Sequence, residues 1–195
     1  NFDMQAGLFI VAPLFPIFLA AVKFIFGPAW LASLALIQIL ASSLSAVYLA
    51  KSAEIIFKKR TVAIVSGILY SLYPSTLYYT HLPCQESLFQ SFFIVFFYFI
   101  CKHYYLRQRR MAVVYLSIFF TLALLTKSHI IIMIPFILGI LNIRRNQIKH
   151  GLIDSALFLS IIFLMTAPWG LYNYFTHNQY IISSSGLGGH FLTGH

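Results

Sequence analysis

Long apolar runs without a charged residue alternate along the chain with short basic clusters. The clearest runs are Ala29–Ala50 with 22 residues, Thr61–Thr80 with 20 and Ser155–Thr176 with 22. A helix of about 20 residues crosses a hydrocarbon core that is roughly 30 Å thick. The pattern therefore predicts an all-α, polytopic membrane protein. Its six transmembrane spans are expected at residues 29–50, 61–80, 87–101, 111–126, 127–143 and 152–172.

The first apolar segment, Met4–Phe26, is harder to assign to a crossing. Pro13 and Pro16 interrupt its first half, and Lys23 lies near its end. A complete crossing stays open as an alternative. The two prolines favour a helix that lies in the membrane interface.

We expect residues 1–195 to form one transmembrane domain. It would consist of an interfacial or partial helix at 4–26, six spans within 29–172 and an extracytoplasmic loop at 173–195. The chain starts with asparagine instead of methionine and ends inside a Ser/Gly-rich stretch. We therefore expect a fragment that is incomplete at both ends.

Basic residues gather in three clusters between the apolar runs. The positive-inside rule predicts that all three face the cytoplasm. Three loops are then extracytoplasmic: Pro74–Glu86, Thr126–His129 and Asn173–His195. The clusters hold 11 of the 13 Lys and Arg residues, namely Lys51, Lys58, Lys59, Arg60, Lys102, Arg107, Arg109, Arg110, Arg144, Arg145 and Lys149.

The composition agrees with a membrane protein. Hydrophobic residues make up 60% of the chain and charged residues 9%, which is too apolar for a soluble domain. The net charge of +9 is explained by the cytoplasmic clusters and by anionic lipid headgroups, so nucleic acid is not expected as a partner. Cys84 and Cys101 lie at opposite ends of one predicted helix, too far apart for a disulfide.

Glu86 and Lys127 are the charged residues that stand out in the extracytoplasmic loops. Glu86 has two interpretations: it caps the first turn of its helix, or it holds a substrate group. Lys127 either snorkels at a helix end or contacts a lipid phosphate. An ion pair between the two residues is a third possibility, because they belong to adjacent hairpins.

Histidines are frequent on the same side, but their spacing does not favour a metal site. No pair has the H-x-x-x-H spacing of ligands on one helix face. The sequence therefore predicts no metal and no cofactor, with a divalent metal as the minor alternative. Five of the seven histidines lie in these loops: His81, His129, His177, His190 and His195.

Four stretches, taken in order, resemble one family. These are the polytopic glycosyltransferases of the GT-C superfamily, and within it the bacterial relatives of protein O-mannosyltransferases and lipid A aminoarabinose transferases. The stretches are a Pro-rich segment, a span–loop–span unit with an acidic residue, a Leu-Thr-Lys turn, and a Pro-Trp motif followed by a Ser/Gly-rich loop. They lie at Ala12–Pro28, Leu72–Phe89, Leu124–Ser128 and Ala167–Gly194.

The resemblance implies inverting transfer of a sugar from a polyprenyl-phosphate donor to a lipid, glycan or protein acceptor. The reaction would take place on the extracytoplasmic face of the bacterial inner membrane. Lys127 would stabilise the leaving phosphate and Glu86 would shape the pocket. The further candidates for substrate binding are His129, Tyr172, Asn173, Gly189 and His190.

Similar enzymes carry a catalytic Asp in a loop that precedes the Pro-rich segment. Asp3 is the candidate here, but it lies so close to Pro13 that the true base is expected upstream. Without that base the fragment would be inactive alone. The chain also departs from the family at three positions: Lys127 replaces Arg, Ser128 replaces Pro, and Tyr172 replaces Arg. The last change removes a charge that could contact phosphate.

Other functional classes stay open. A transporter would carry ionisable residues deep inside its spans and often repeated or broken helices. Here the charges lie at span ends and no internal repeat is visible. A non-catalytic membrane subunit and a lipid-linked sugar polymerase or ligase are the remaining alternatives.

Overall fold

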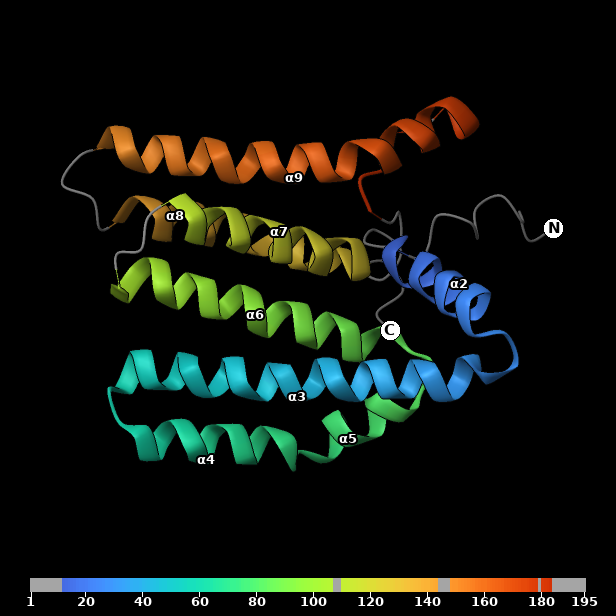
Figure 1. The fold of residues 1–195 in the computed structure, drawn as a ribbon. Helices are drawn as coiled ribbons and strands as arrows, with labels where there is room; N and C mark the ends of the chain where they lie inside the picture. Colours follow the sequence, from blue (N-terminus) through green and yellow to red (C-terminus); the bar gives the residue numbers. More distant parts are fainter. Residues whose placement is uncertain (1–11, 107–109, 144–147, 179, 184–195) are drawn as a thin grey trace, which may run out of the picture.

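The structure is a computed structural model that describes residues 12–106, 110–143, 148–178 and 180–183. The described part is helical and contains no strand, which confirms the all-α prediction. Its long helices run side by side and alternate in direction (Figure 1). The α-helices are α2 Leu14–Phe26, α3 Trp30–Phe57, α4 Arg60–Ser71, α5 Pro74–His81, α6 Gln85–Leu106, α7 Arg110–Thr126, α8 Ile134–Ile143 and α9 Ile148–His177.

The predicted span at 61–80 is not one continuous helix. α4 ends at Ser71, and Pro74 begins the short helix α5. A proline fits the first helical position because its missing N–H would have no partner there. The preceding residue, Tyr73, is extended, as expected for a residue before proline. The apolar run therefore contains a bend, which Pro74 indicates in the sequence although the hydrophobicity does not.

The predicted span at 127–143 is also divided. Lys127 has an extended backbone that ends the helix before it. A 3-10 helix, η2, covers Ser128–Met133, and α8 then runs over Ile134–Ile143. Pro135 lies in the first turn of α8, where a proline is tolerated.

Other helices are longer than the uncharged runs that predicted them. α3 continues to Phe57, past the predicted end at residue 50, and α6 continues to Leu106. These extra turns carry charged residues, because a helix does not need to stop where the hydrocarbon core ends. α9 contains Pro168, and its axis bends toward its C-terminal end, where this proline lies (Figure 1).

Helix α2 lies obliquely at the end of the bundle where α3 begins (Figure 1). It packs against α3 and α7, and Gly27 ends it with a φ of 52°. Its 13 residues span about 20 Å, less than a hydrocarbon core of about 30 Å. Residues 4–11 lie outside the described part, so the interfacial assignment of 4–26 stays a prediction.

The core of the bundle is aromatic. Phe96 of α6, Phe120 of α7 and Phe158 of α9 are fully buried, with ring centroids 5.4 Å and 5.3 Å apart in succession. By contrast, large apolar side chains are exposed on the outside of the bundle, such as Phe24 at 91% and Phe175 at 81%. An exposed apolar surface of this extent suits lipid as the solvent.

Two helical stretches in the described part are long and apolar enough to cross a membrane, Leu14–Phe57 and Lys149–Thr176. Arg60–Ser71, Met111–Thr126 and Ser128–Asn142 are shorter apolar helices. These findings fit an all-α membrane protein. The number of crossings and the division of the domain stay predictions.

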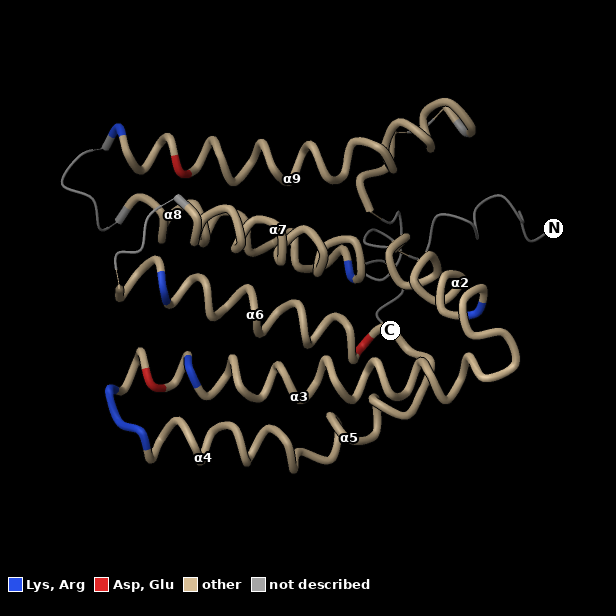
Figure 2. The backbone as a smooth tube through the Cα atoms, in the orientation of Figure 1, with Lys and Arg blue, Asp and Glu red and all other residues tan. Residues whose placement is uncertain are grey.

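Charged residues of the described part lie in two layers at opposite ends of the bundle (Figure 2). Most Lys and Arg residues lie at the end where α3 passes into α4. At the opposite end lie Glu86 in the first turn of α6, Lys127 directly after α7 and Lys23 in the last turn of α2. The described members of the three basic clusters therefore share one end, as the sequence predicted.

Candidate functional site

Antiparallel packing of α6 against α7 brings together the two charged residues singled out in the sequence. Glu86 lies in the first turn of α6, and Lys127 follows the last residue of α7. The two helices contact each other along their lengths, so the start of one lies beside the end of the other. Lys127 still donates its backbone N–H to the Ala123 carbonyl at 2.8 Å, which fixes its backbone to the last turn of α7.

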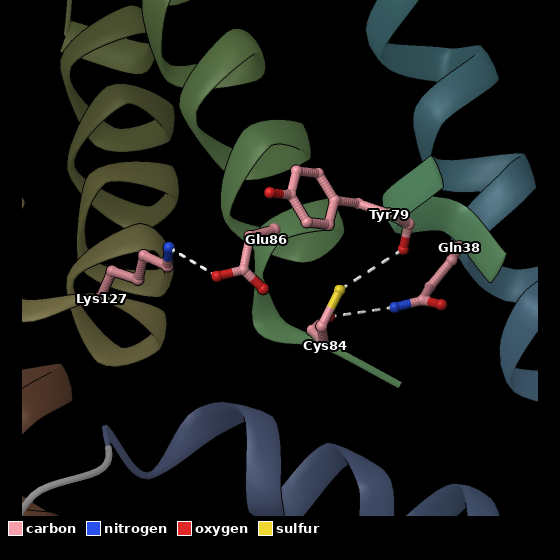
Figure 3. Close-up of polar contacts among 5 residues, drawn as sticks. All are labelled: Gln38, Tyr79, Cys84, Glu86 and Lys127. Carbon is pink, nitrogen blue, oxygen red and sulfur yellow. Dashed lines mark hydrogen bonds and ion pairs between the residues drawn. The ribbon is translucent and has the colours of Figure 1, made fainter. Parts of the chain in front are cut away.

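Glu86 and Lys127 form an ion pair, with 2.8 Å between Lys127 Nζ and Glu86 Oε1 (Figure 3). The two side chains are partly buried, 29% and 22% exposed respectively. Burial by itself raises the pKa of Glu86. The hydrogen bond from Lys127, a backbone N–H and the charge of Lys127 outweigh it, so the pKa is lower than usual. The ionised pair is therefore the stable form.

Phe89 and His129 support this pair. The Lys127 ammonium lies 5.8 Å from the centroid of the Phe89 ring, within the range of a cation–π interaction. The His129 ring lies 5.3 Å from the same ring. Burial, and then the positive charge of Lys127, lower the pKa of His129. Protonation of His129 is thus disfavoured beside the ion pair.

The start of α6 is held in place by its neighbours (Figure 3). The fully buried Gln38 of α3 donates a hydrogen bond from Nε2 to the Cys84 carbonyl at 3.2 Å. The Cys84 thiol donates to the Tyr79 carbonyl of α5 at 3.6 Å. Burial and then the adjacent Glu86 raise the pKa of Cys84, so the thiol stays protonated and can donate. These contacts fix the backbone that carries Glu86.

Gln38 was not singled out from the sequence as a residue of the site, although its position gives a reason to do so. It is an amide inside a long apolar run, and a buried amide in lipid needs a hydrogen-bond partner. That requirement predicts a contact with another element. It does not predict which element.

Asn173 of α9 is buried, at 1% exposure, and donates from Nδ2 to the Ile181 carbonyl at 3.4 Å. Ser183 donates to the Leu124 carbonyl of α7 at 2.7 Å. These two bonds fold the segment after α9 back onto α7. The structure thus gives Asn173 a role in holding this segment, and its contact with substrate stays a prediction.

The other predicted site residues are less closely connected. Tyr172 is 55% exposed and stacks on Trp169, with the ring centroids 5.6 Å apart. Asp3, Gly189 and His190 lie outside the described residues. The structure therefore brings Glu86, Lys127 and His129 together, and their role in substrate binding stays a prediction.

No group of three or more His, Cys, Asp and Glu residues that could hold a metal ion occurs within the described ranges. The histidine of the site, His129, packs against the Phe89 ring, which is not a metal ligand. The expectation that the protein needs no cofactor stays a prediction.

Comparison with known proteins decides the family. A sequence model of the family described as dolichyl-phosphate-mannose-protein mannosyltransferase matches residues 11–175, more than four-fifths of the chain. The chain belongs to this family. No curated protein and no solved structure matches it. The resemblance to GT-C glycosyltransferases is thereby confirmed, and the protein is a membrane glycosyltransferase of this type. The matched range includes Glu86, Lys127 and His129.

Proposed function

We propose that this protein transfers a sugar from a polyprenyl-phosphate donor to an acceptor hydroxyl, with inversion at the anomeric carbon. The Glu86–Lys127 pair is the observation that carries the proposal. It lies at the end of the bundle opposite the basic clusters (Figure 2). By the positive-inside rule we infer that this end is extracytoplasmic. The location in a bacterial inner membrane is proposed from the family resemblance. The acceptor class, whether lipid, glycan or protein, follows the family resemblance.

Lys127 is proposed to stabilise the leaving group. When the bond between the anomeric carbon and the phosphate oxygen breaks, negative charge accumulates on the polyprenyl phosphate. A cation placed where this charge develops lowers the barrier of the reaction. Lys127 is half-buried beside Phe89, where its charge is less screened than in water. A lysine acts here as a point charge, without the fork of the arginine that the family has at this position.

The base of the reaction is proposed to be an aspartate that precedes the Pro-rich segment. It would accept the proton of the acceptor hydroxyl during attack on the anomeric carbon. Asp3 is the candidate in this chain. A carboxylate on the same membrane face as Lys127 is needed for both groups to meet one substrate.

The lipid tail of the donor is proposed to lie along the aromatic surface of α6. Phe89 and Phe93 stack with ring centroids 6.0 Å apart, one helical turn from each other. Phe92 and Phe99 continue toward the opposite end of α6, each against Phe119 of α7. These rings are partly buried against the core and begin beside Lys127, so a phosphate on Lys127 would place its prenyl chain along the parts of the rings that stay exposed.

Transfer from a radiolabelled polyprenyl-phosphate sugar, assayed in native membranes with the full-length protein, tests the proposal. We expect Lys127→Ala to reduce transfer by about 10²-fold or more, the usual cost of losing one charge-stabilising group. Replacing Asp3, the acidic residue before Pro13, by Asn tests whether it is the base, which complete loss of transfer would show. The exposed Lys59→Ala at the opposite end is the matched control and should retain activity. Failure of the wild type to use any such donor would contradict the proposal.

A further inference from the structure

Lys127 is already paired with Glu86. In the proposed function the same lysine binds the phosphate of the donor. Glu86 Oε1 lies 2.8 Å from Lys127 Nζ, and both side chains are partly buried. In this contact the charges of the carboxylate and the ammonium offset each other. A phosphate that approached Lys127 while Glu86 remained in contact would bring a second anion against the carboxylate, at a cost in repulsion.

We propose that Glu86 is a displaceable counter-ion that holds the place of the lipid phosphate on Lys127 until the donor binds. The inference rests on the proposed function, since it concerns the same lysine. Donor binding would exchange one anion for another: the phosphate takes the Lys127 contact, and the carboxylate turns away. No covalent bond changes in this step.

The surroundings of the pair suit such an exchange. Lys127 keeps its second contact, the face of the Phe89 ring at 5.8 Å, when the carboxylate leaves. Its backbone is held independently by the hydrogen bond to Ala123. The lysine therefore stays in place while its partner changes.

Glu86 also retains a favourable environment after it leaves Lys127. It lies in the first turn of the 22-residue helix α6, where the helix dipole stabilises a negative charge. At 29% exposure its carboxylate can reach water without unfolding of the helix. The Gln38–Cys84 bond keeps the backbone of this turn fixed during the exchange.

The exchange would contribute to donor selectivity. A half-buried lysine without a partner would attract any phosphate lipid of the membrane. With Glu86 in place, a lipid phosphate must displace a carboxylate, and a ligand succeeds only if it gains other contacts. A polyprenyl chain against the aromatic surface of α6 supplies such contacts.

Binding of undecaprenyl phosphate to the full-length protein in neutral-lipid nanodiscs tests the inference. The protein is measured as wild type, Glu86→Gln, Lys127→Met and the double variant. Removing the competing anion should tighten the Kd by about fivefold, which corresponds to the energy of a partly exposed ion pair. Lys127→Met should weaken binding by about tenfold or more, and the double variant should bind like Lys127→Met alone. Glu54→Gln, an exposed residue at the opposite end, matches the charge change and should leave the Kd unaltered.

The possible outcomes separate the two proposals. Unaltered or weaker binding by Glu86→Gln, with weak binding by Lys127→Met, overturns the exchange and leaves the proposed function standing. Normal binding by Lys127→Met overturns the role of Lys127 in the proposed function. If Glu86→Gln tightens the Kd equally in the wild type and in Lys127→Met, Glu86 only repels the phosphate, and the exchange is overturned. Binding of phosphatidylglycerol to the wild type as tight as that of undecaprenyl phosphate overturns the donor assignment. Glu86→Ala provides a second variant in case Glu86→Gln does not fold.

Discussion

Ser183 donates a hydrogen bond to the backbone carbonyl of Leu124 at 2.7 Å, across 59 positions of sequence. Both residues are buried. Carbonyls in the last turn of a helix have no partner within the helix, and this bond satisfies one of them in α7. Since Leu124 lies three residues before Lys127, the segment that follows α9 is tied to the helix end that carries the candidate cation.

Loss of this contact should destabilise the site end of the bundle. Ser183→Ala leaves a buried carbonyl without its partner, which costs about 1–3 kcal/mol. We expect a lower thermal midpoint in detergent and faster proteolysis of the chain after α9. Ser43→Ala, which removes an exposed bond to its own helix, is the matched control and should have a smaller effect. Equal stability of the two variants would contradict a structural role for Ser183.

The crossing of α3 and α4 depends on a small residue at Gly67. A Cβ at this position would lie 3.3 Å from Ala50 Cβ and 3.4 Å from the Ala46 carbonyl oxygen. A larger side chain must push the helices apart. We expect Gly67→Leu to cost about 1–3 kcal/mol, the usual range for overpacking.

Gly139→Leu provides the matched comparison for this substitution. Gly139 is also helical, and a Cβ there would meet nothing within 4 Å. We therefore expect little loss of stability in the same thermal assay. If Gly139→Leu destabilised the protein as much as Gly67→Leu, helix separation would not be the cause.

The ion pair should make stability depend on pH in the acidic range. The folded-state pKa of Glu86 is lower than its usual value of 4.5. The contribution of the pair is therefore fully present above that value and is lost as the pH falls through the folded-state pKa. We expect the difference in thermal midpoint between wild type and Glu86→Gln to be largest at neutral pH and to vanish in acid. A difference that does not change with pH would contradict this assignment.

The titration of His129 should report the charge on Lys127. Burial and this charge both lower the His129 pKa from its usual 6.5. In Lys127→Met the charge is removed and burial remains, so the pKa should rise but stay lower than usual. NMR titration of the histidine ring in both proteins measures this change. The exposed Lys59→Ala should leave the His129 pKa unaltered, and a change there would point to a general electrostatic effect.

The sequence by itself determined that the protein is all-α and built for a membrane. Uncharged runs of about 20 residues, separated by loops that hold most of the basic residues, are typical of transmembrane helices. The sequence also indicated which loops share one end, because alternating helices reverse direction at each crossing. Glu86 and Lys127 could be singled out because a charged side chain at the end of a transmembrane span costs free energy unless it is paired or hydrated.

Only the tertiary structure decided how these residues meet. An ion pair was one of three possibilities for Glu86 and Lys127, and the packing of α6 against α7 realised it at 2.8 Å. The proline at position 74 indicated the bend there, but the partner of Gln38 could not be derived from the sequence. Hydrophobic pattern fixes which segments enter the membrane, since that depends on each segment's own transfer energy. Contacts between segments depend on shape and distance across the bundle, which no single segment encodes.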